Sequence, residues 1–198
     1  MNEQIVKISQ AFLAQSSLEL VAVICAILYV VLVIKENSWC WFFAFVSTAL
    51  FIYLFHQVSL LSESLLNIYY LVMAVYGWWQ WSSTKAMKTL RIQRWSMKRH
   101  SLIVVGCLLL TPLLGYFTAS LGASFPYIDA LVALLSVVAT YMVTKKVFEN
   151  WYYWLFIDSV SIYLFWQKQL YFVAALYVGY LVLVFIGIKA WKKTMQHV

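Results

Sequence analysis

Charged side chains are scarce in this sequence. Asp, Glu, Lys and Arg make up 11% of the 198 residues, whereas 65% are hydrophobic. A soluble domain of this length needs a polar surface, which such a composition does not provide. The hydrophobic residues also form long runs, close to the roughly 20 residues with which an α-helix crosses a bilayer, rather than the short alternating segments of a membrane β-barrel. The sequence therefore predicts an all-α membrane protein without a soluble catalytic domain.

Motifs that carry chemistry are missing as well. The three cysteines, Cys25, Cys40 and Cys107, show no paired spacing and lie in or beside hydrophobic runs. They are predicted to be small buried residues rather than metal ligands or a disulfide. The chain has no glycine-rich phosphate loop, no HExxH zinc motif and no nucleophile elbow. We therefore expect a protein that is not an enzyme and that holds neither a cofactor nor a metal.

Seven hydrophobic runs predict seven transmembrane helices. They lie at about residues 16–34, 40–56, 61–81, 101–120, 127–144, 151–166 and 169–188. Residues 1–15 are predicted to form an N-terminal segment, with a short interfacial helix as one interpretation.

The basic residues lie between these runs, so the net charge of +7 indicates membrane topology rather than nucleic-acid binding. If the loop between the third and fourth helices is cytoplasmic, twelve Lys and Arg lie inside and two, Lys7 and Lys168, lie outside. The inside set is Lys35, Lys85, Lys88, Arg91, Arg94, Lys98, Arg99, Lys145, Lys146, Lys189, Lys192 and Lys193. We therefore expect a multi-pass protein of the inner (plasma) membrane, with the N-terminus out and the C-terminus in.

The chain contains an internal repeat. When Glu19 is placed on Asp129, the segment from Glu19 to Trp81 aligns without a gap on Asp129 to Trp191, and fifteen pairs are identical. These pairs include rare types such as Trp41/Trp151 and Gln57/Gln167. The repeat predicts a first three-helix bundle at 16–81, a basic loop and linking helix at 82–126, a second bundle at 127–191 and a cytoplasmic tail at 192–198. Equivalent helices are four positions apart in the order of helices, an even number, so the 3+1+3 repeats are parallel, an arrangement typical of carriers that bind substrate between the repeats.

Asp158 is predicted to lie near the middle of the sixth helix. A carboxylate at that depth costs about 2.5–3.5 kcal/mol on insertion scales unless it faces a partner or a cavity. Trp151, Trp154 and Asp158 are spaced i, i+3 and i+7, so they share one helix face. Two indoles and a carboxylate are suited to a flat aromatic cation, by stacking and cation–π attraction. The alternatives are a protonated or hydrogen-bonded structural Asp, and tryptophans of the interfacial belt.

Further candidates follow from the third helix and from the repeat. Asn67 and Tyr70 lie on one face of the third helix, and Asn67 is either a substrate ligand or a polar contact between helices. Tyr177 is the repeat equivalent of Asn67, and Thr48 is the equivalent of Asp158, so both are expected to face the same central cavity. Gly77 and Gly187 are predicted to permit close helix packing.

The segment LLNIYYLVMAVYGWW at 65–79 and the W-x2-W-x3-D pattern at Trp151, Trp154 and Asp158 resemble the Pnu family of vitamin transporters. The resemblance extends from about Glu19 to Lys193. It implies vitamin uptake across the bilayer by facilitated diffusion, trapping of the vitamin by phosphorylation inside the cell, and a homotrimer. By motif, it implies substrate contacts at Trp151, Trp154, Asn67 and Tyr70.

The chain departs from the family pattern at two places in the expected pocket. Family members that carry nicotinamide riboside usually have Asn where this chain has Asp158, and often Gln where it has Met73 and Ala74. Thiamine and nicotinamide riboside are both flat, cationic and hydroxyl-bearing, and a fixed carboxylate suits either charge. We expect a thiamine-type member, with nicotinamide riboside as the alternative substrate.

Two other classes remain open from the residues alone. An intramembrane enzyme would use Asp158 as an acid or base, but no partnering His, Ser or second carboxylate is expected at matching depth. A seven-helix receptor needs neither a parallel repeat nor an acid in the middle of the membrane. Movement of labelled vitamin down a gradient would distinguish a carrier from both.

Overall fold

The computed structural model describes residues 17–57, 61–83, 90–168 and 170–196. The predicted N-terminal segment 1–15, with Lys7, and the loop residues Lys85 and Lys88 lie outside the described residues. The described ranges contain seven α-helices: α2 (Ser17–Ile34), α3 (Cys40–Gln57), α4 (Leu61–Ser82), α6 (Met97–Ser120), α7 (Pro126–Thr144), α8 (Asn150–Gln167) and α9 (Tyr171–Gln196). The prediction of an all-α membrane protein with seven transmembrane helices is confirmed.

Two helix boundaries differ from the prediction by more than two residues. α6 begins at Met97, four residues earlier than expected, and α9 continues to Gln196, beyond the predicted 188. Both extensions are rich in Lys and Arg. Hydropathy predicts that such residues lie outside a bilayer, whereas the helix itself continues through them. Four helical segments are long and apolar enough to span by composition alone: Ser17–Ile34, Met97–Ser120, Pro126–Thr144 and Val173–Gln196.

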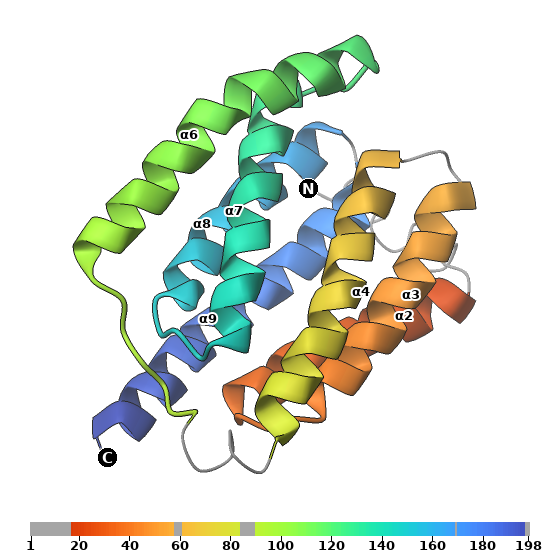
Figure 1. Ribbon diagram of the computed structural model, residues 1–198. Coiled ribbons are helices and arrows are strands. Elements are labelled where there is room, and N and C mark those ends of the chain that lie inside the picture. The colour runs from red at the N-terminus through yellow and green to blue at the C-terminus, as the bar shows by residue number, and fades with distance from the viewer. Residues whose placement is uncertain (1–16, 58–60, 84–89, 169, 197–198) are drawn as a thin grey trace, which may run out of the picture.

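The helices form two three-helix groups (Figure 1). α2, α3 and α4 pack together, α7, α8 and α9 pack together, and α6 lies outside against α7. Between the groups, α4 contacts α7 and α2 contacts α9. Because α4 is the repeat equivalent of α9 and α2 that of α7, these two contacts are related by the same pseudo-two-fold axis, as in parallel repeats.

The repeat is visible in single hydrogen bonds. At the end of α2, the amide of Glu36 donates to Val33 O at 3.0 Å and that of Asn37 to Leu32 O at 2.9 Å. At the equivalent end of α7, Lys146 donates to Val143 O at 2.9 Å and Val147 to Met142 O at 2.9 Å. Glu36 and Lys146 both adopt the left-handed conformation, with φ of 54° and 50°. The two connections therefore share one helix-terminating turn.

All basic residues of the described ranges except Lys168 lie toward one end of the bundle, which we call the basic end. It is formed by the connections 35–39 and 145–149, segment 90–96 and the last turns of α9. Segment 90–96 is fixed to the second connection. Gln93 donates to Lys146 O at 3.0 Å, and Phe148 donates to Gln93 O at 2.8 Å. Arg94 pairs with Glu149 at 3.0 Å.

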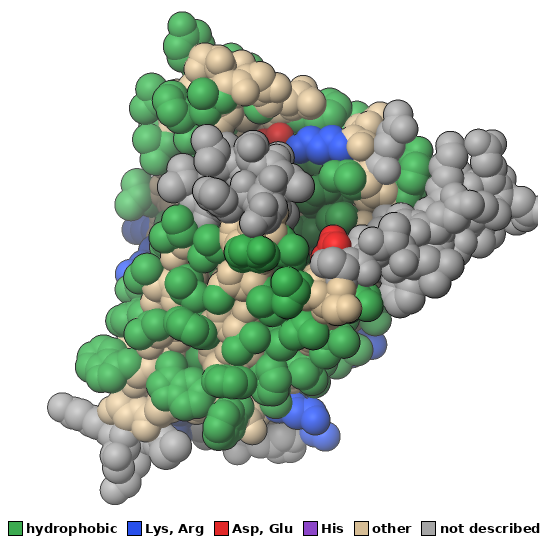
Figure 2. Space-filling view, turned by 90° about the vertical axis from the view of Figure 1, so that its right-hand side faces the viewer, with side chains coloured by type: hydrophobic (Ala, Val, Ile, Leu, Met, Phe, Trp, Pro, Cys, Tyr) green, Lys and Arg blue, Asp and Glu red, His purple; other side chains and the backbone are tan. Residues whose placement is uncertain are grey.

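The outer surface is largely apolar. Most described side chains on the face shown in Figure 2 are hydrophobic. On α6, Leu102, Leu109 and Leu113 are each more than 70% exposed. An apolar surface of this extent is expected to contact lipid.

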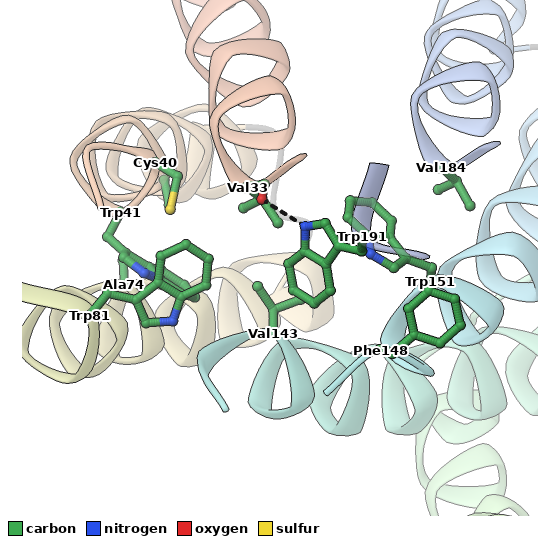
Figure 3. Packing of buried hydrophobic residues seen from close by; sticks show 11 residues of the cluster. Val33, Cys40, Trp41, Ala74, Trp81, Val143, Phe148, Trp151, Val184 and Trp191 are labelled. Atoms are coloured by element: carbon green, nitrogen blue, oxygen red, sulfur yellow. Dashed lines mark hydrogen bonds between the residues drawn. The ribbon is translucent and has the colours of Figure 1, made fainter. Parts of the chain in front are cut away.

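The larger of the two clusters of buried hydrophobic residues in the described ranges lies at the basic end, where the two repeats meet (Figure 3). Four tryptophans, Trp41, Trp81, Trp151 and Trp191, are almost completely buried there with Val33, Val143 and Phe148. We call this cluster the tryptophan junction. Trp41 meets Trp81 edge to face at 5.5 Å between ring centroids, and Trp151 meets Trp191 at 5.4 Å, the geometry that aromatic pairs prefer.

Two glycines make room for this packing. A Cβ atom at Gly77 would overlap the indole of Trp41, and one at Gly187 would overlap the indole of Trp151. The expectation that these glycines permit close packing is therefore confirmed. In both repeats, an indole ring from the neighbouring helix packs directly on the glycine.

We predict that Gly187→Ala lowers the melting temperature of the detergent-solubilised protein, because the added methyl group would have to displace the ring of Trp151. Overpacking of this kind costs about 1–3 kcal/mol. The matched control is Gly179→Ala on the same helix, where a Cβ atom meets nothing within 4 Å. Alanine favours a helix over glycine by about 1 kcal/mol, so this variant should be at least as stable as the parent. Equal melting temperatures for the two variants would contradict the packing argument.

Candidate functional site

Asp158 is buried near the middle of α8, with 3% of its surface exposed. No ion pair to Asp158 is present among the residues for which side chains are described, where the Lys and Arg partners are Glu36, Asp129 and Glu149. A buried carboxylate without a cationic partner is costly in a medium of low dielectric constant. The prediction of a mid-membrane acid without a matching Lys or Arg thus agrees with the structure over these residues.

Two tyrosines approach this carboxylate from different helices. Tyr70 on α4 and Tyr180 on α9 both interact electrostatically with Asp158. The hydroxyl of Tyr70 is also hydrogen-bonded to the side chain of Ser136 on α7. Tyr70 and Tyr180 are repeat equivalents, so their positions are related by the pseudo-two-fold axis. The four residues come from α4, α7, α8 and α9, which places the candidate site between the repeats.

A neighbouring hydrogen bond holds this arrangement together. The hydroxyl of Tyr69 on α4 donates to Val137 O on α7 at 2.8 Å, so it joins the two repeats next to the Tyr70–Ser136 contact. On α9, the ring of Tyr177 packs edge to face on Tyr180 at 5.7 Å and lies 5.1 Å from Phe165. Tyr177 therefore lies beside the site, next to a residue that faces Asp158.

Asn67 and Thr48 are buried in the first repeat, each with 9% of its surface exposed. Asn67 lies one turn before Tyr70 on α4, so it shares the face that carries Tyr70. The hydroxyl of Thr48 donates to Ala44 O at 2.7 Å and lies 3.2 Å from Phe45 O. Its donor is therefore satisfied within α3, and only the lone pairs of its oxygen remain for a ligand.

The two tryptophans of the predicted binding face lie in different surroundings. Trp151 belongs to the tryptophan junction, with 2% of its surface exposed and its ring against Gly187 and Trp191. Trp154 is partly exposed and packs between the junction and a second cluster formed by α6, α7 and α8. Trp154 is one helical turn from Asp158 and Trp151 is two, about 10 Å away along the axis. The contacts of Trp151 are those of a packing residue, whereas Trp154 is closer to the carboxylate.

Sequence reasoning missed two residues of this group. Tyr180 had a signal, because it is the repeat equivalent of Tyr70. Ser136 had none, because nothing along the chain shows which residue of α7 faces α4. Ser136 lies at the depth of Asp158, since both are eight residues from the basic ends of their helices, but its hydrogen bond is with Tyr70.

The chemistry of this group favours binding over catalysis. It combines one carboxylate with phenol and alcohol hydroxyls, and no group of three metal-ligating side chains occurs in the ranges searched. His100, the one histidine whose surroundings are described, lies at the basic end, where Nδ1 is 3.1 Å from the Tyr153 hydroxyl. A carboxylate with hydroxyl donors and aromatic rings can hold a flat cation by charge, hydrogen bonds and stacking.

Comparison with known proteins defines the class. The sequence profile of the nicotinamide mononucleotide transporter family matches residues 16–193. The nicotinamide riboside transporter PnuC of Escherichia coli (strain K12) is 26% identical over 200 residues, which cover 87% of this chain and 82% of that protein. The riboflavin/roseoflavin transporter RibM of Streptomyces davaonensis is 27% identical over 127 residues, covering 61% of this chain and 59% of RibM. The crystal structure of the vitamin B3 transporter PnuC has the same fold, with a TM-score of 0.76 at 20% identity, covering 98% of this chain and 90% of that one.

The protein is therefore a multi-pass membrane transporter and not an enzyme. It belongs to the nicotinamide mononucleotide transporter family, the Pnu family of vitamin transporters.

We predict that Trp151→Ala destabilises the protein far more than Trp154→Ala. Removing an enclosed tryptophan leaves a cavity that costs about 3–5 kcal/mol, whereas the ring of Trp154 is partly exposed. Melting temperatures in detergent measure the difference. Trp79→Ala on α4 serves as a control, because that ring is 65% exposed. A similar loss for Trp151→Ala and Trp79→Ala would contradict the packing role of Trp151.

Proposed function

We propose that this protein carries a flat, monovalent vitamin cation into the cell by facilitated diffusion. The observation that supports this most directly is Asp158, a buried carboxylate without a cationic partner among the described side chains, which interacts electrostatically with tyrosines from both repeats. A substrate with a positive ring would supply the missing charge. Its hydroxyl groups would bond to Tyr70, Tyr180 and Asn67, and Trp154, with Trp151 behind it, would pack on its flat face.

Nicotinamide riboside is the first candidate substrate. The relative that covers most of the chain is a transporter of nicotinamide riboside, and the protein with the same fold is a transporter of vitamin B3. The pyridinium ring of nicotinamide riboside is flat and positively charged, and its ribose supplies hydroxyl groups. Its charge, flat ring and hydroxyl groups therefore suit the carboxylate, aromatic rings and hydroxyls of the proposed site.

Thiamine is the second candidate, because of the identity of residue 158. Carriers of nicotinamide riboside in this family usually have an amide there, whereas this chain has a carboxylate. A fixed negative charge strengthens binding of the thiazolium ring of thiamine, which has no amide of its own to bond with Asn. Thr48 and Tyr177 would complete the pocket from the first and second repeats.

We further propose the cellular context of this transport. The basic end faces the cytoplasm of the inner membrane, so the C-terminus is inside and the N-terminus outside. Kinases inside the cell would trap the vitamin by phosphorylation, and the protein would assemble as a homotrimer, as the family resemblance implies. A reporter fused after His197 would test the orientation, and an external signal would overturn it.

We predict that Asp158→Asn separates the two candidate substrates. The change keeps the shape and hydrogen-bonding capacity of the side chain but removes its charge. Loss of a charge-assisted contact, about 1.5–3 kcal/mol, weakens binding by about tenfold or more. Thiamine affinity should fall by this factor, while nicotinamide riboside affinity should be kept or improved. Titration of the purified protein with both compounds and with riboflavin measures this, and unchanged affinity for every ligand would remove Asp158 from the site.

We predict that uptake needs no ion gradient. The membrane potential contributes about 2.3 kcal/mol per charge and 100 mV, which corresponds to about 50-fold accumulation of a monovalent cation. Proteoliposomes with an imposed potassium diffusion potential, negative inside, should therefore concentrate the labelled vitamin. Reversing the sign of the potential is the matched control. A strict requirement for sodium or protons would overturn the uniport proposal.

A further inference from the structure

The turns at residues 36 and 146 meet on the pseudo-two-fold axis. Glu36 and Lys146 are repeat equivalents, and Lys146 Nζ lies 2.9 Å from Glu36 Oε2. Two equivalent residues can touch each other only where the axis passes between them. The shared left-handed turn orients both side chains toward this point. The contact therefore joins the two repeats at their centre.

On each side of this pair, an indole donates a hydrogen bond to the other repeat. Trp81 Nε1 on α4 donates to Thr144 O on α7 at 3.0 Å, and Trp191 Nε1 on α9 donates to Val33 O on α2 at 3.2 Å. Figure 3 shows the second bond, with the ring of Trp191 lying next to Val33 and Val143. Both acceptors are carbonyls in the last turn of a helix, and Val33 O also accepts from the amide of Glu36.

The ion pair and the indoles form one unit. Lys146 Nζ lies 4.7 Å from the ring centroid of Trp81, within range of a cation–π contact. A single ammonium group thus binds a carboxylate and an indole of the first repeat. Separation of the repeats at this end would break the ion pair, the cation–π contact and both indole hydrogen bonds together.

This unit lies at the basic end, on the far side of the tryptophan junction's helix ends from the candidate site. Ser136 and Thr144 are eight residues apart on α7, which is about 12 Å along the helix axis. The tryptophan junction lies at the Thr144 end of this distance. A substrate that leaves the site toward the basic end has to pass between the repeats where these contacts hold them together. In a carrier, a route on one side of the site must open while the other is closed, so contacts of this kind must break and form again in each cycle.

We propose that Glu36 and Lys146 are the gate pair of the basic end, and that with the crossed indoles of Trp81 and Trp191 they close the path from the site. The two side chains are 25% and 13% exposed, so water can solvate both charges when they separate. Partly exposed ion pairs contribute only about 0–1 kcal/mol, which allows repeated opening. The proposal of a gate depends on the protein being a member of the transporter family. It does not depend on which vitamin is carried.

Cys40 supplies a natural probe of the gate. It lies in the tryptophan junction and is completely buried, so a maleimide reaches its thiol only when the junction opens. The experiment uses full-length protein in detergent with Cys25→Ser and Cys107→Ser as background. Lys146→Glu places two negative charges at the axis, and should raise the labelling rate of Cys40 by about fivefold to tenfold. The reversed pair Glu36→Lys/Lys146→Glu should return the rate to that of the parent.

The control is the ion pair between Lys168 and Asp129, which has the same chemistry and a distance of 3.0 Å but lies within the second repeat at the opposite end. Lys168→Glu should leave the labelling rate of Cys40 within about twofold of the parent. If Lys146→Glu does not fold, Lys146→Gln removes the attraction without adding repulsion and should give a smaller rise. Uptake by proteoliposomes should fall for Lys146→Glu and recover for the reversed pair.

Labelling needs no substrate, so a wrong vitamin assignment leaves the result intact. An unchanged labelling rate in well-folded Lys146→Glu or Lys146→Gln would overturn the gate. A rate that stays high in the reversed pair would do the same, because it would show that the charges act separately and not on each other.

Discussion

The protein depends on two hydrogen bonds that cross between its halves. The indoles of Trp81 and Trp191 each donate to a helix-end carbonyl of the opposite repeat. Carbonyls in the last turn of a helix have no partner further along that helix. Thr144 O receives the indole of Trp81, and Val33 O receives the indole of Trp191 in addition to the amide of Glu36. The glycines at 77 and 187 admit the rings of Trp41 and Trp151, and these two rings then pack edge to face on the donor indoles. Close helix packing and the junction of the repeats are thus parts of one arrangement.

The candidate site departs from this symmetry where chemistry is needed. Tyr70 and Tyr180 preserve it, but Asp158 corresponds to Thr48 and Ser136 corresponds to Ala26. The first two helices of each repeat contribute polar groups to the site unequally. Most of these groups therefore come from the second repeat. A ligand between the repeats would meet charge and hydroxyls from α7 and α8, and less polar surface from α2 and α3. The asymmetry would give the ligand one preferred orientation.

The sequence predicted the architecture because membrane helices follow local rules. The lengths of the hydrophobic runs predicted seven helices. A constant offset of the sequence between the two halves, without a gap, predicted the parallel repeat. The matching turns at Glu36 and Lys146 confirm this repeat. The surroundings of individual side chains depend on which helices become neighbours, and spacing along one helix does not contain that information. Trp151 and Trp154 share a face with Asp158, yet one is enclosed in the junction and the other is partly exposed. Ser136 became part of the site only through contact with α4, and the binding roles of these residues remain predictions.

The ion pair on the axis has a consequence for how such a protein can be built. If the two halves were separate copies of one three-helix chain, the same residue would occupy both positions at the axis. Two Glu or two Lys side chains would then repel each other at the place where the halves must touch. Opposite charges at residues 36 and 146 require halves of different sequence, and encoding both halves in one polypeptide allows each to differ from the other. The linking helix α6, which returns the chain to its starting side of the bilayer, is what makes such a fusion geometrically possible.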